Sequence, residues 1–280
     1  MNHPKISIVT PSYNQGEFLE ETIESVLGQG YSNLEYLILD GGSTDNSVEI
    51  IKKYEDHLTY WRSHPDSGQA AALREGFEIA TGQLLNWVNS DDRLAPDALA
   101  SVAEAFSQHG PDVVIAGGCL VFDHGSPGRV HWPRFQTNFE QPQPIPLPLI
   151  LDIEGHWLGG AFFYQPEVFI PRTSYAVAGE IRSHLHITMD YDLWVRLALN
   201  GSRIVVIENV LAEYREHPAQ KTADYSRVIR DLVSTANEYL SDERSGLIRT
   251  QRQLLKVSNL LAANRTTRRG LRTIRRVLNV

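Results

Sequence analysis

Residues 7–29, SIVTPSYNQGEFLEETIESVLGQ, combine two hydrophobic periods on either side of a polar loop. The continuous apolar run at 6–10 predicts a short buried strand. Helical spacing then relates five apolar residues, Phe18, Leu19, Ile23, Val26 and Leu27. Residues 34–39 are apolar again, so this part of the chain is predicted to be strand, helix, strand.

The same alternation continues along the N-terminal part of the chain. It predicts helices at 47–54, 68–80 and 97–109, and strands near 58–62, at 84–88 and at 112–116. Strands that alternate with helices of this length indicate an α/β fold with a largely parallel sheet covered on both faces. In such sheets a ligand binds beyond the carboxyl ends of the strands.

Polar loops follow the first four predicted strands, with the sequences TPSYNQG, DGGSTDNS, HPDSGQ and NSDD. Three of these loops carry carboxylates: Asp40 and Asp45, Asp66, and Asp91 with Asp92. A single polar loop carries little information, because loops are generally polar. Four of them at one edge of a sheet predict a binding site.

Asp91 and Asp92 are adjacent and directly follow an apolar run, which brings two like charges together. A divalent cation between them would offset the repulsion, and Mg²⁺ or Mn²⁺ prefers such oxygen ligands. A solvated acidic loop before a helix that begins near Asp97 is the alternative explanation.

Length and composition indicate a soluble globular protein. The chain has 280 residues, 42% of them hydrophobic and 21% charged, which argues against a disordered or fibrous class. Cys119 is the only cysteine, so no internal disulfide is possible and a reducing, cytoplasmic setting fits. Because no signal-like N-terminus and no stretch of about 18 apolar residues occurs, we expect neither secretion nor a membrane span.

The net charge of −8 is unevenly distributed along the chain. Residues 241–280 hold ten Lys/Arg and two Asp/Glu, a balance of +8, which leaves −16 on the rest. Six arginines of the last stretch interleave with apolar residues at helical spacing: Arg265, Arg268, Arg269, Arg272, Arg275 and Arg276. Such a helix is typical of a peripheral contact with an anionic membrane, and a helix docked on its own acidic domain is an equal alternative. Nucleic acid is disfavoured because no aromatic residues interleave with these arginines.

Residues 139–150, FEQPQPIPLPLI, carry prolines at four alternate positions. The prolines are expected to exclude helix and central strand and to favour an extended crossing segment. A second half of the chain follows, with WLGGAFF at 157–163 and a predicted helix in MDYDLWVRLALNG at 189–201.

Six segments together resemble the inverting glycosyltransferases of family 2, which have the GT-A fold. They are SIVTPSYNQGEFLEETIESVLGQ, LILDGGSTDNSVEII, PDSGQAAALREGFEIATGQLLNWVNSDD, GGAFF, MDYDLWVRL and YREHPAQKT, and they occur in the family's order over roughly 5–222. The resemblance implies a catalytic domain at 1–225, with a nucleotide-sugar-binding half at 1–118 and an acceptor half at 119–225. The basic helical segment 226–280 would then be an extension.

The resemblance implies a nucleotide-diphosphate sugar donor, with a UDP- or TDP-linked sugar favoured. The PSYN segment, through Pro11 and Tyr13, would offer flat surfaces to the base, and Asp40 would accept a hydrogen bond from its imide N–H. Asp66, in PDSG, would lie near the base as well. A turn or helix cap before two glycines is the alternative role for Asp40.

The resemblance also implies a bound Mg²⁺ or Mn²⁺. Asp91 and Asp92 match the family's metal and ribose carboxylates, although the first position of that motif is Asn89 in this chain. The amide adds no charge, so weaker metal affinity is expected. His217 matches a histidine that in several relatives closes over the metal or the diphosphate, and neutral imidazole suits Mn²⁺. Arg215 and Lys221 flank it as candidate phosphate partners.

Asp190 matches the family's catalytic base, which takes the proton from an acceptor hydroxyl. Met189 replaces the usual acidic neighbour, and Asp192 is expected to have a structural role in the first turn of its helix. The predicted function is metal-dependent, inverting sugar transfer to a glycan or lipid-linked acceptor in surface polysaccharide synthesis. A nucleotide-sugar-binding protein without turnover and a sugar-phosphate nucleotidyltransferase are the alternatives. The second is disfavoured because TPSYNQGEF holds no Lys or Arg.

Overall fold

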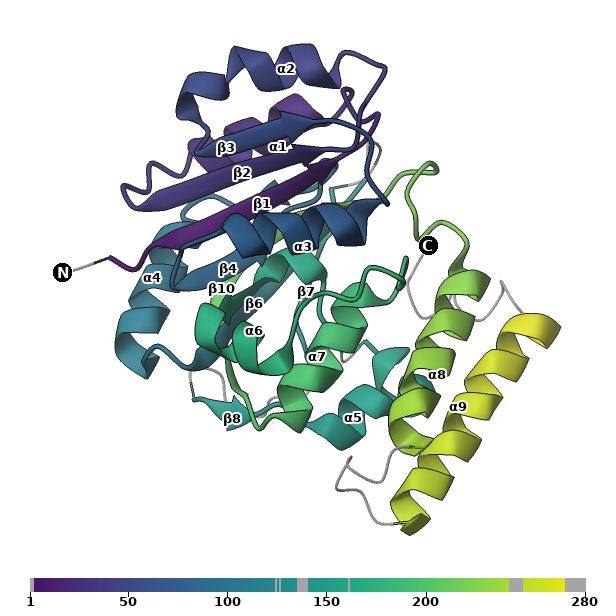
Figure 1. Cartoon of the computed structure of the whole chain (residues 1–280). Helices are drawn as coiled ribbons and strands as arrows, with labels where there is room; N and C mark the ends of the chain where they lie inside the picture. Colours follow the sequence, from purple (N-terminus) through teal and green to yellow (C-terminus); the bar gives the residue numbers. More distant parts are fainter. Residues whose placement is uncertain are drawn as a thin grey trace.

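The computed structural model describes residues 3–123, 125, 127–134, 141–160, 162–241 and 249–269. Its central feature is one curled sheet with helices on both faces (Figure 1). The strands follow the order β3-β2-β1-β4-β9-β6-β10-β5, with β7 paired to β6 and β8 paired to β10. The predicted α/β class is therefore confirmed.

The first half of the sheet is parallel. It contains β1 (Ile6–Ser12), β2 (Leu34–Asp40), β3 (Tyr60–Ser63) and β4 (Leu84–Trp87). Backbone pairing places Ser12 opposite Asp40, and Asp40 opposite Ser63. The carboxyl ends of three strands therefore lie in one row, which is the arrangement that the polar loops predicted.

The second half of the sheet contains a reversal that the sequence did not predict. Strand β9 (Val168–Pro171) lies between β4 and β6 (Val113–Phe122) and is antiparallel to both. Strand β10 (Arg203–Arg215) is parallel to β6. Three short strands complete the sheet: β5 (Arg93–Leu94), β7 (Arg129–His131) and β8 (Gln143–Pro144).

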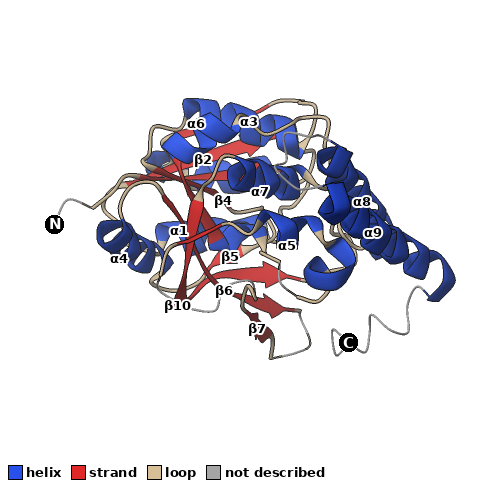
Figure 2. Cartoon of the chain, turned by 90° about the horizontal axis from the view of Figure 1, so that it is seen from below, coloured by secondary structure: helices blue, strands red, loops and turns tan. Residues whose placement is uncertain are grey.

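Alternate residues of the strands build a core on each face of the sheet. One face packs against α1 (Leu19–Leu27), α2 (Ser47–Lys53) and α4 (Ala98–His109). The other packs against α3 (Gln69–Ile79), α6 (Arg172–Ala178) and α7 (Met189–Leu199), as Figure 2 shows from below. Both faces are covered, as predicted for a largely parallel sheet.

The proline-rich segment departs from its prediction. Residues Leu147–Leu151 form the short helix α5, with Pro148 in the first turn, where a missing N–H costs nothing. Pro144 lies in β8, which pairs only with the first two residues of β10. The expectation that the prolines exclude helix throughout 139–150 was therefore wrong for α5. Residues 135–140 lie outside the described part of the chain.

Three short helical turns, η1 (Glu55–His57), η2 (Ile153–Trp157) and η3 (Gln165–Glu167), connect the larger elements. Two long helices, α8 (Tyr225–Ser241) and α9 (Arg249–Arg269), lie side by side as a hairpin that packs against α5 and η2, on the far side of α7 from the strands (Figure 1). Across the described residues, no helix is both long enough and apolar enough to span a membrane. The predicted apolar face of the tail lies outside the description, since side chains 264–269 and residues 270–280 are not described.

Candidate active site

The first part of the site is the row of strand ends at Ser12, Asp40 and Ser63. Asp40 is fully buried, and its carboxylate is held by its own turn. Oδ2 accepts hydrogen bonds from the backbone N–H groups of Gly42 and Ser43 and from the Ser63 hydroxyl, and Oδ1 accepts one from Ser43 Oγ. This geometry gives Asp40 the turn-forming role, and the residue is covered by its surroundings in this structure.

Tyr13, Gly41 and Asp66 form an open surface beside this turn. The Tyr13 side chain is 61% exposed, which is unusual for a large aromatic residue. A Cβ on Gly41 would lie 3.4 Å from Tyr13 Cδ2 and 3.5 Å from Asp66 Oδ1, so the glycine lies between them. Pro11 differs from these residues, because it is buried within β1 and pairs with Leu39. An aromatic face next to a carboxylate suits a flat base that carries N–H donors.

Asp66 is itself partly engaged. Its Oδ1 accepts the backbone N–H of Gly68 at 2.7 Å, and its Oδ2 accepts a hydrogen bond from Arg62 at 3.0 Å. The guanidinium of Arg62 also contacts Glu75. Asp66 is thus fixed in place at the rim of the surface.

A second group of residues follows β4. Asp91 Oδ2 lies 3.1 Å from His217 Nε2, and the amide of Gln15 approaches the same oxygen at 3.5 Å. The His217 ring packs on Phe18 with 4.8 Å between ring centroids. The loop after β4 and the loop after β10 therefore meet, and they bring together two of the three predicted metal ligands.

Asp92 points in a different direction from Asp91. It is 1% exposed, and its Oδ1 accepts the backbone N–H of Arg215 at 3.1 Å. Its Oδ2 accepts the Asn89 amide at 3.0 Å. Burial and the nearby Asp91 charge raise the pKa of Asp92 well above its usual range. Asp92 thus joins the loop to β10, and this geometry does not support the expectation that it binds a metal directly.

The donor set for a divalent cation is therefore partial. Among the described residues, no three His, Cys, Asp or Glu side chains gather in a way that would hold a metal. Asp91 and His217 nevertheless present one oxygen and one nitrogen toward each other, which fits a cation that takes its remaining ligands from substrate oxygens and water. The residues fit such a shared site and do not fit a closed metal cage.

Asp190 lies in the first turn of α7. Its carboxylate accepts the backbone N–H of Tyr191. Burial raises the pKa of Asp190 to about 6, against the opposing effects of that backbone bond and of the Lys221 charge. Met189, next to it, is buried in the core, so no second carboxylate lies at that position. A carboxylate with a pKa near neutrality suits a general base.

A relay of side-chain hydrogen bonds, which the sequence did not predict, connects Lys221 to the loop after β4. Lys221 Nζ donates to Gln69 Oε1 at 2.8 Å, and Gln69 Nε2 donates to Asn89 Oδ1 at 2.7 Å. Asn89 Nδ2 then donates to Asp92 and, at 3.1 Å, to Gln165. Lys221, whose charge acts on Asp190, is thereby connected to the loop that carries Asp91.

Two other charged residues have structural roles. Arg215 is 3% exposed, pairs with Glu21 at 2.7 Å and donates to the Asp91 carbonyl at 3.0 Å. Its guanidinium lies over the rings of Phe18 and Phe122. Its predicted role as a phosphate partner is not supported by these contacts. Asp192 is buried between two arginines, Arg182 and Arg196, which confirms its predicted structural role.

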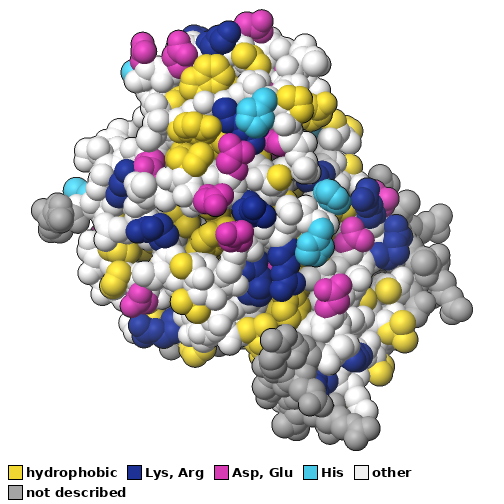
Figure 3. All heavy atoms as spheres, viewed as in Figure 1, with side chains coloured by type: hydrophobic (Ala, Val, Ile, Leu, Met, Phe, Trp, Pro, Cys, Tyr) yellow, Lys and Arg dark blue, Asp and Glu magenta, His cyan; other side chains and the backbone are white. Residues whose placement is uncertain are grey.

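Charge on the molecular surface is mixed. On the face that Figure 3 shows, Lys and Arg side chains are interspersed with Asp and Glu, and histidines lie among them. No broad basic patch marks the described residues of that face.

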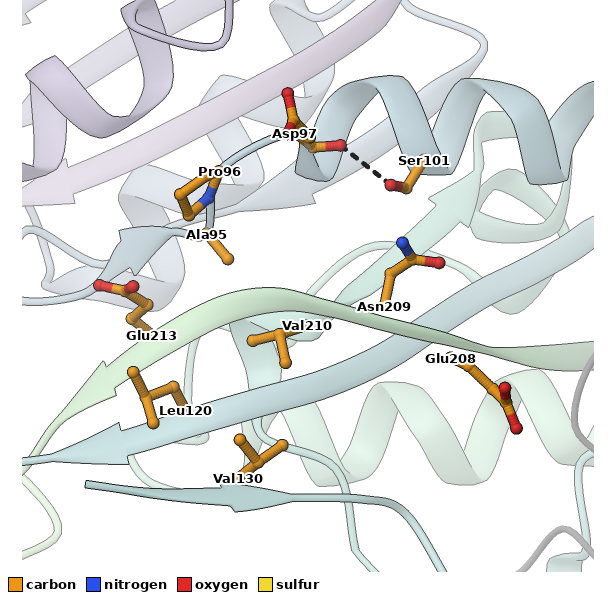
Figure 4. A pocket seen from close by; sticks show the side chains of 10 residues that line it. All are labelled: Ala95, Pro96, Asp97, Ser101, Leu120, Val130, Glu208, Asn209, Val210 and Glu213. Atoms are coloured by element: carbon orange, nitrogen blue, oxygen red, sulfur yellow. Dashed lines mark hydrogen bonds between the residues drawn. The ribbon is translucent and has the colours of Figure 1, made fainter. Parts of the chain in front are cut away.

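A hollow of about 470 Å³ lies apart from the predicted site (Figure 4). Its lining includes Pro96, Asp97, Leu120, Val130, Asn209 and Glu213, and the Asp97 carbonyl accepts a bond from Ser101. None of the predicted site residues lines it. The candidate active site is therefore an open edge of the sheet, built from the loops after β1, β2, β3, β4 and β10 and from the start of α7.

Sequence comparison matches this chain to a known family. The model of "Glycosyl transferase family 2" matches residues 7–165, more than half of the chain. An uncharacterized glycosyltransferase of Mycobacterium tuberculosis is 38% identical over 110 residues, which are 39% of this chain and 42% of that protein. TuaG of Bacillus subtilis, named for teichuronic acid biosynthesis, is 32% identical over 129 residues, 44% of this chain and 50% of that one. The matched stretch thus spans at most half the length of these two relatives.

Solved structures share the fold. S. aureus TarS 1-349 in complex with UDP superposes with a TM-score of 0.65 at 18% identity, over 99% of this chain and 75% of that chain. The mannosyltransferase PcManGT from Pyrobaculum calidifontis, in complex with GDP-Man and Mn²⁺, gives a TM-score of 0.63 at 17% identity. That match covers 100% of this chain and 79% of the other. At these identities the likeness establishes the fold alone.

Proposed function

The chain belongs to glycosyl transferase family 2, and on that premise we propose that it transfers a sugar from a nucleotide-diphosphate donor to an acceptor hydroxyl. The observation that carries the proposal is the meeting of Asp91 and His217 beyond β4 and β10. In the same loop as Asp91, Asn89 is hydrogen-bonded through Gln69 to Lys221, whose charge acts on Asp190. An edge of this kind brings a donor site and a general base together.

In the proposed reaction, the Asp190 carboxylate accepts the proton of the acceptor hydroxyl. The acceptor oxygen attacks the anomeric carbon from the side opposite the nucleotide, and the bond from that carbon to the diphosphate oxygen breaks. The configuration at the anomeric carbon is thereby inverted, and the nucleotide diphosphate leaves with the bonding electron pair. The pKa of about 6 keeps Asp190 charged at neutral pH while leaving it basic enough to accept a proton.

Asp91 and His217 would hold a divalent cation together with the donor diphosphate. Bound there, Mg²⁺ or Mn²⁺ supplies positive charge that offsets the charge of the leaving group. Asp92 contributes by fixing the loop through Arg215 and Asn89. The complex of PcManGT with GDP-Man and Mn²⁺ supports a metal in a protein of this fold.

The surface around Tyr13, Gly41 and Asp66 would bind the base of a UDP- or TDP-linked donor. The UDP complex of TarS supports a uridine nucleotide. The acceptor would be a glycan or lipid-linked hydroxyl of a surface polysaccharide, which the name of TuaG supports. A cytoplasmic enzyme held at the inner face of the membrane by its basic C-terminus would meet such an acceptor.

Calorimetric titration with UDP, TDP, GDP and ADP, each with Mn²⁺ and with chelator, tests the proposal. Tight binding of one nucleotide that requires Mn²⁺ is the expected result. Donor turnover that disappears in Asp190→Asn while nucleotide binding persists separates an enzyme from a nucleotide-sugar-binding protein. Binding of none of the four nucleotides overturns the proposal.

A further inference from the structure

We propose that the C-terminal hairpin of α8 and α9 fixes the position of the catalytic base in the active site, with Thr235 and Asn259 as positioning residues for Asp190. The inference rests on the proposed role of Asp190 as the base. It assigns a function to a segment that the sequence suggested was an extension, and it depends on contacts at two independent places.

The first contact is between α8 and the start of α7. The Thr188 and Thr235 hydroxyls lie 3.0 Å apart, and the two residues are 2% and 4% exposed. Thr188 precedes α7 directly, two positions before Asp190, and its side chain caps no helical N–H. One turn further along, the Tyr239 hydroxyl donates to Asp192 Oδ1 at 2.5 Å. Helix α8 therefore holds both flanks of Asp190.

The second contact is between α9 and the turn η2. Asn259 is fully buried, its Nδ2 donates to the Leu151 carbonyl, and its Oδ1 accepts the Ile153 N–H, each at 2.9 Å. Beside it, Ser258 donates to Asp152 Oδ1 at 2.8 Å. One asparagine thus satisfies a donor and an acceptor of the backbone at the point where α5 passes into η2, a turn of the π-helical type, which often occurs at functional sites.

From η2 the contacts lead back to α7. The Trp157 ring, at the end of η2, packs edge-on against the Tyr191 ring with 5.0 Å between centroids. The Tyr191 hydroxyl donates to the Ile150 carbonyl at 3.1 Å. Because Tyr191 is the immediate neighbour of Asp190, its ring and hydroxyl fix the direction of the turn that carries the base. Asn259 secures the segment against which Tyr191 rests.

These contacts explain what the hairpin does. Strands and loops of the sheet position Asp91 and His217, whereas Asp190 lies on a helix whose first turn is held from α8, and through η2 from α9. A base must lie within hydrogen-bond reach of the hydroxyl it deprotonates, and a small displacement reduces the rate strongly. Thr235 and Asn259 set that position without touching the substrate.

The test uses the full chain with Thr235→Val, Thr235→Ser and Asn259→Leu. Ser241→Ala is the control, because Ser241 is exposed at the end of α8 and its hydroxyl accepts a hydrogen bond from Lys256 of α9. Three quantities are measured: UDP affinity with Mn²⁺ by calorimetry, UDP release from UDP-N-acetylglucosamine in water, and hydrogen–deuterium exchange of 186–192. We expect Thr235→Val and Asn259→Leu to slow UDP release about tenfold, to leave UDP affinity within about twofold, and to speed exchange in 186–192. Thr235→Ser, which keeps the hydroxyl, and Ser241→Ala should match the wild type.

The inference is overturned if residues 186–192 exchange at the wild-type rate in both Thr235→Val and Asn259→Leu. Faster exchange spread over β1, β2 and β3 also overturns it, because the residues would then support the fold in general. If Asn259→Leu does not fold, Thr235→Val decides alone. Unchanged UDP release in Asp190→Asn contradicts the proposed function, whereas the exchange measurement still reports whether the hairpin holds α7.

Discussion

His217 Nε2 lies 3.1 Å from Asp91 Oδ2, although 126 positions separate the two residues in the chain. The loop after β4 meets the loop after β10 at this point, and Phe18 covers the other side of the imidazole. A carboxylate oxygen and an imidazole nitrogen at this separation can turn toward one cation with little movement, whereas Asp92 is turned into the interior.

His217→Ala tests the assignment of this pair. We expect Mn²⁺-dependent UDP binding to weaken about tenfold, because one of two protein ligands is lost while Asp91 and the diphosphate remain. Calorimetry with Mn²⁺ and with chelator measures the difference, and His109→Ala, at the end of α4, is the matched control. A Mn²⁺ dependence equal to that of the wild type would refute the assignment.

Asn89→Asp tests the relay. The Asn89 amide donates to Asp92 and Gln165, so a carboxylate at 89 would face two acceptors and add a charge next to two others. We expect the variant to lose about 2 kcal/mol of unfolding free energy at pH 8. Crowded, buried carboxylates bind protons more tightly in the native state, so the loss should shrink as the pH falls toward 5. Urea unfolding at both pH values measures it, with the exposed Asn33→Asp as control, and an equal loss at pH 5 and pH 8 would contradict it.

Tyr13→Ala tests the proposed base surface. Stacking of a base on an aromatic ring contributes about 1–3 kcal/mol, so UDP affinity should fall by about tenfold or more. Tyr60→Ala, an exposed tyrosine of β3, is the control. Unchanged UDP affinity in Tyr13→Ala would place the base elsewhere.

The sequence was most informative about the sheet edge. Polar loops follow the strands, so the sequence predicts that Asp66, Asp91 and the turn at Asp40 lie at one edge. Parallel pairing of β1 with β2 and β4, and of β2 with β3, places the carboxyl ends of these strands at that edge. The direction of each carboxylate was not predictable, because it depends on partners distant in sequence. Asp92 turns inward because the N–H of Arg215, at the end of β10, lies there.

Two features had no local signal. Strand β9 is antiparallel between β4 and β6, and its neighbours are set by packing across the sheet rather than by the period of its own residues. Gln69 at the start of α3 was unremarkable in sequence, since its importance comes from Lys221, 152 positions later. Long-range partners of this kind are visible only in the folded chain.

Removal of residues 265–280 tests the membrane contact. Each Lys or Arg near an anionic surface contributes about 1 kcal/mol, and this segment holds six arginines. We expect binding to phosphatidylserine-containing vesicles to weaken at least about 100-fold at low salt, whereas UDP affinity stays unchanged. Vesicle sedimentation measures the binding, and a full-length chain with the six arginines changed to glutamine separates charge from length. Retained binding in both variants would assign the tail a structural role.

The ionisation of Asp190 predicts the pH dependence of the reaction. Its pKa of about 6 means that the rate of UDP release should rise tenfold per pH unit below 6 and level off above it, because only the carboxylate accepts a proton. Asp190→Asn should remove this limb together with the rate. A wild-type rate that is flat between pH 5 and 7 would contradict the assignment.

The same ionisation predicts a change in stability. Because burial raises the pKa of Asp190 in the folded state, its contribution to stability is intact below the unfolded value of 3.8 and is lost as the pH rises through about 6. At pH 7.5 the charged side chain destabilises the native state, so Asp190→Asn should raise the free energy of unfolding by about 1–3 kcal/mol. At pH 3.5 the difference between the two proteins should disappear. Urea unfolding at both pH values measures it, and Asp56→Asn, at an exposed carboxylate, should show no such pH-dependent gain. A destabilised Asp190→Asn at pH 7.5 would mean that the carboxylate is held by partners that favour its charge, which is the opposite of what a base poised for proton transfer requires.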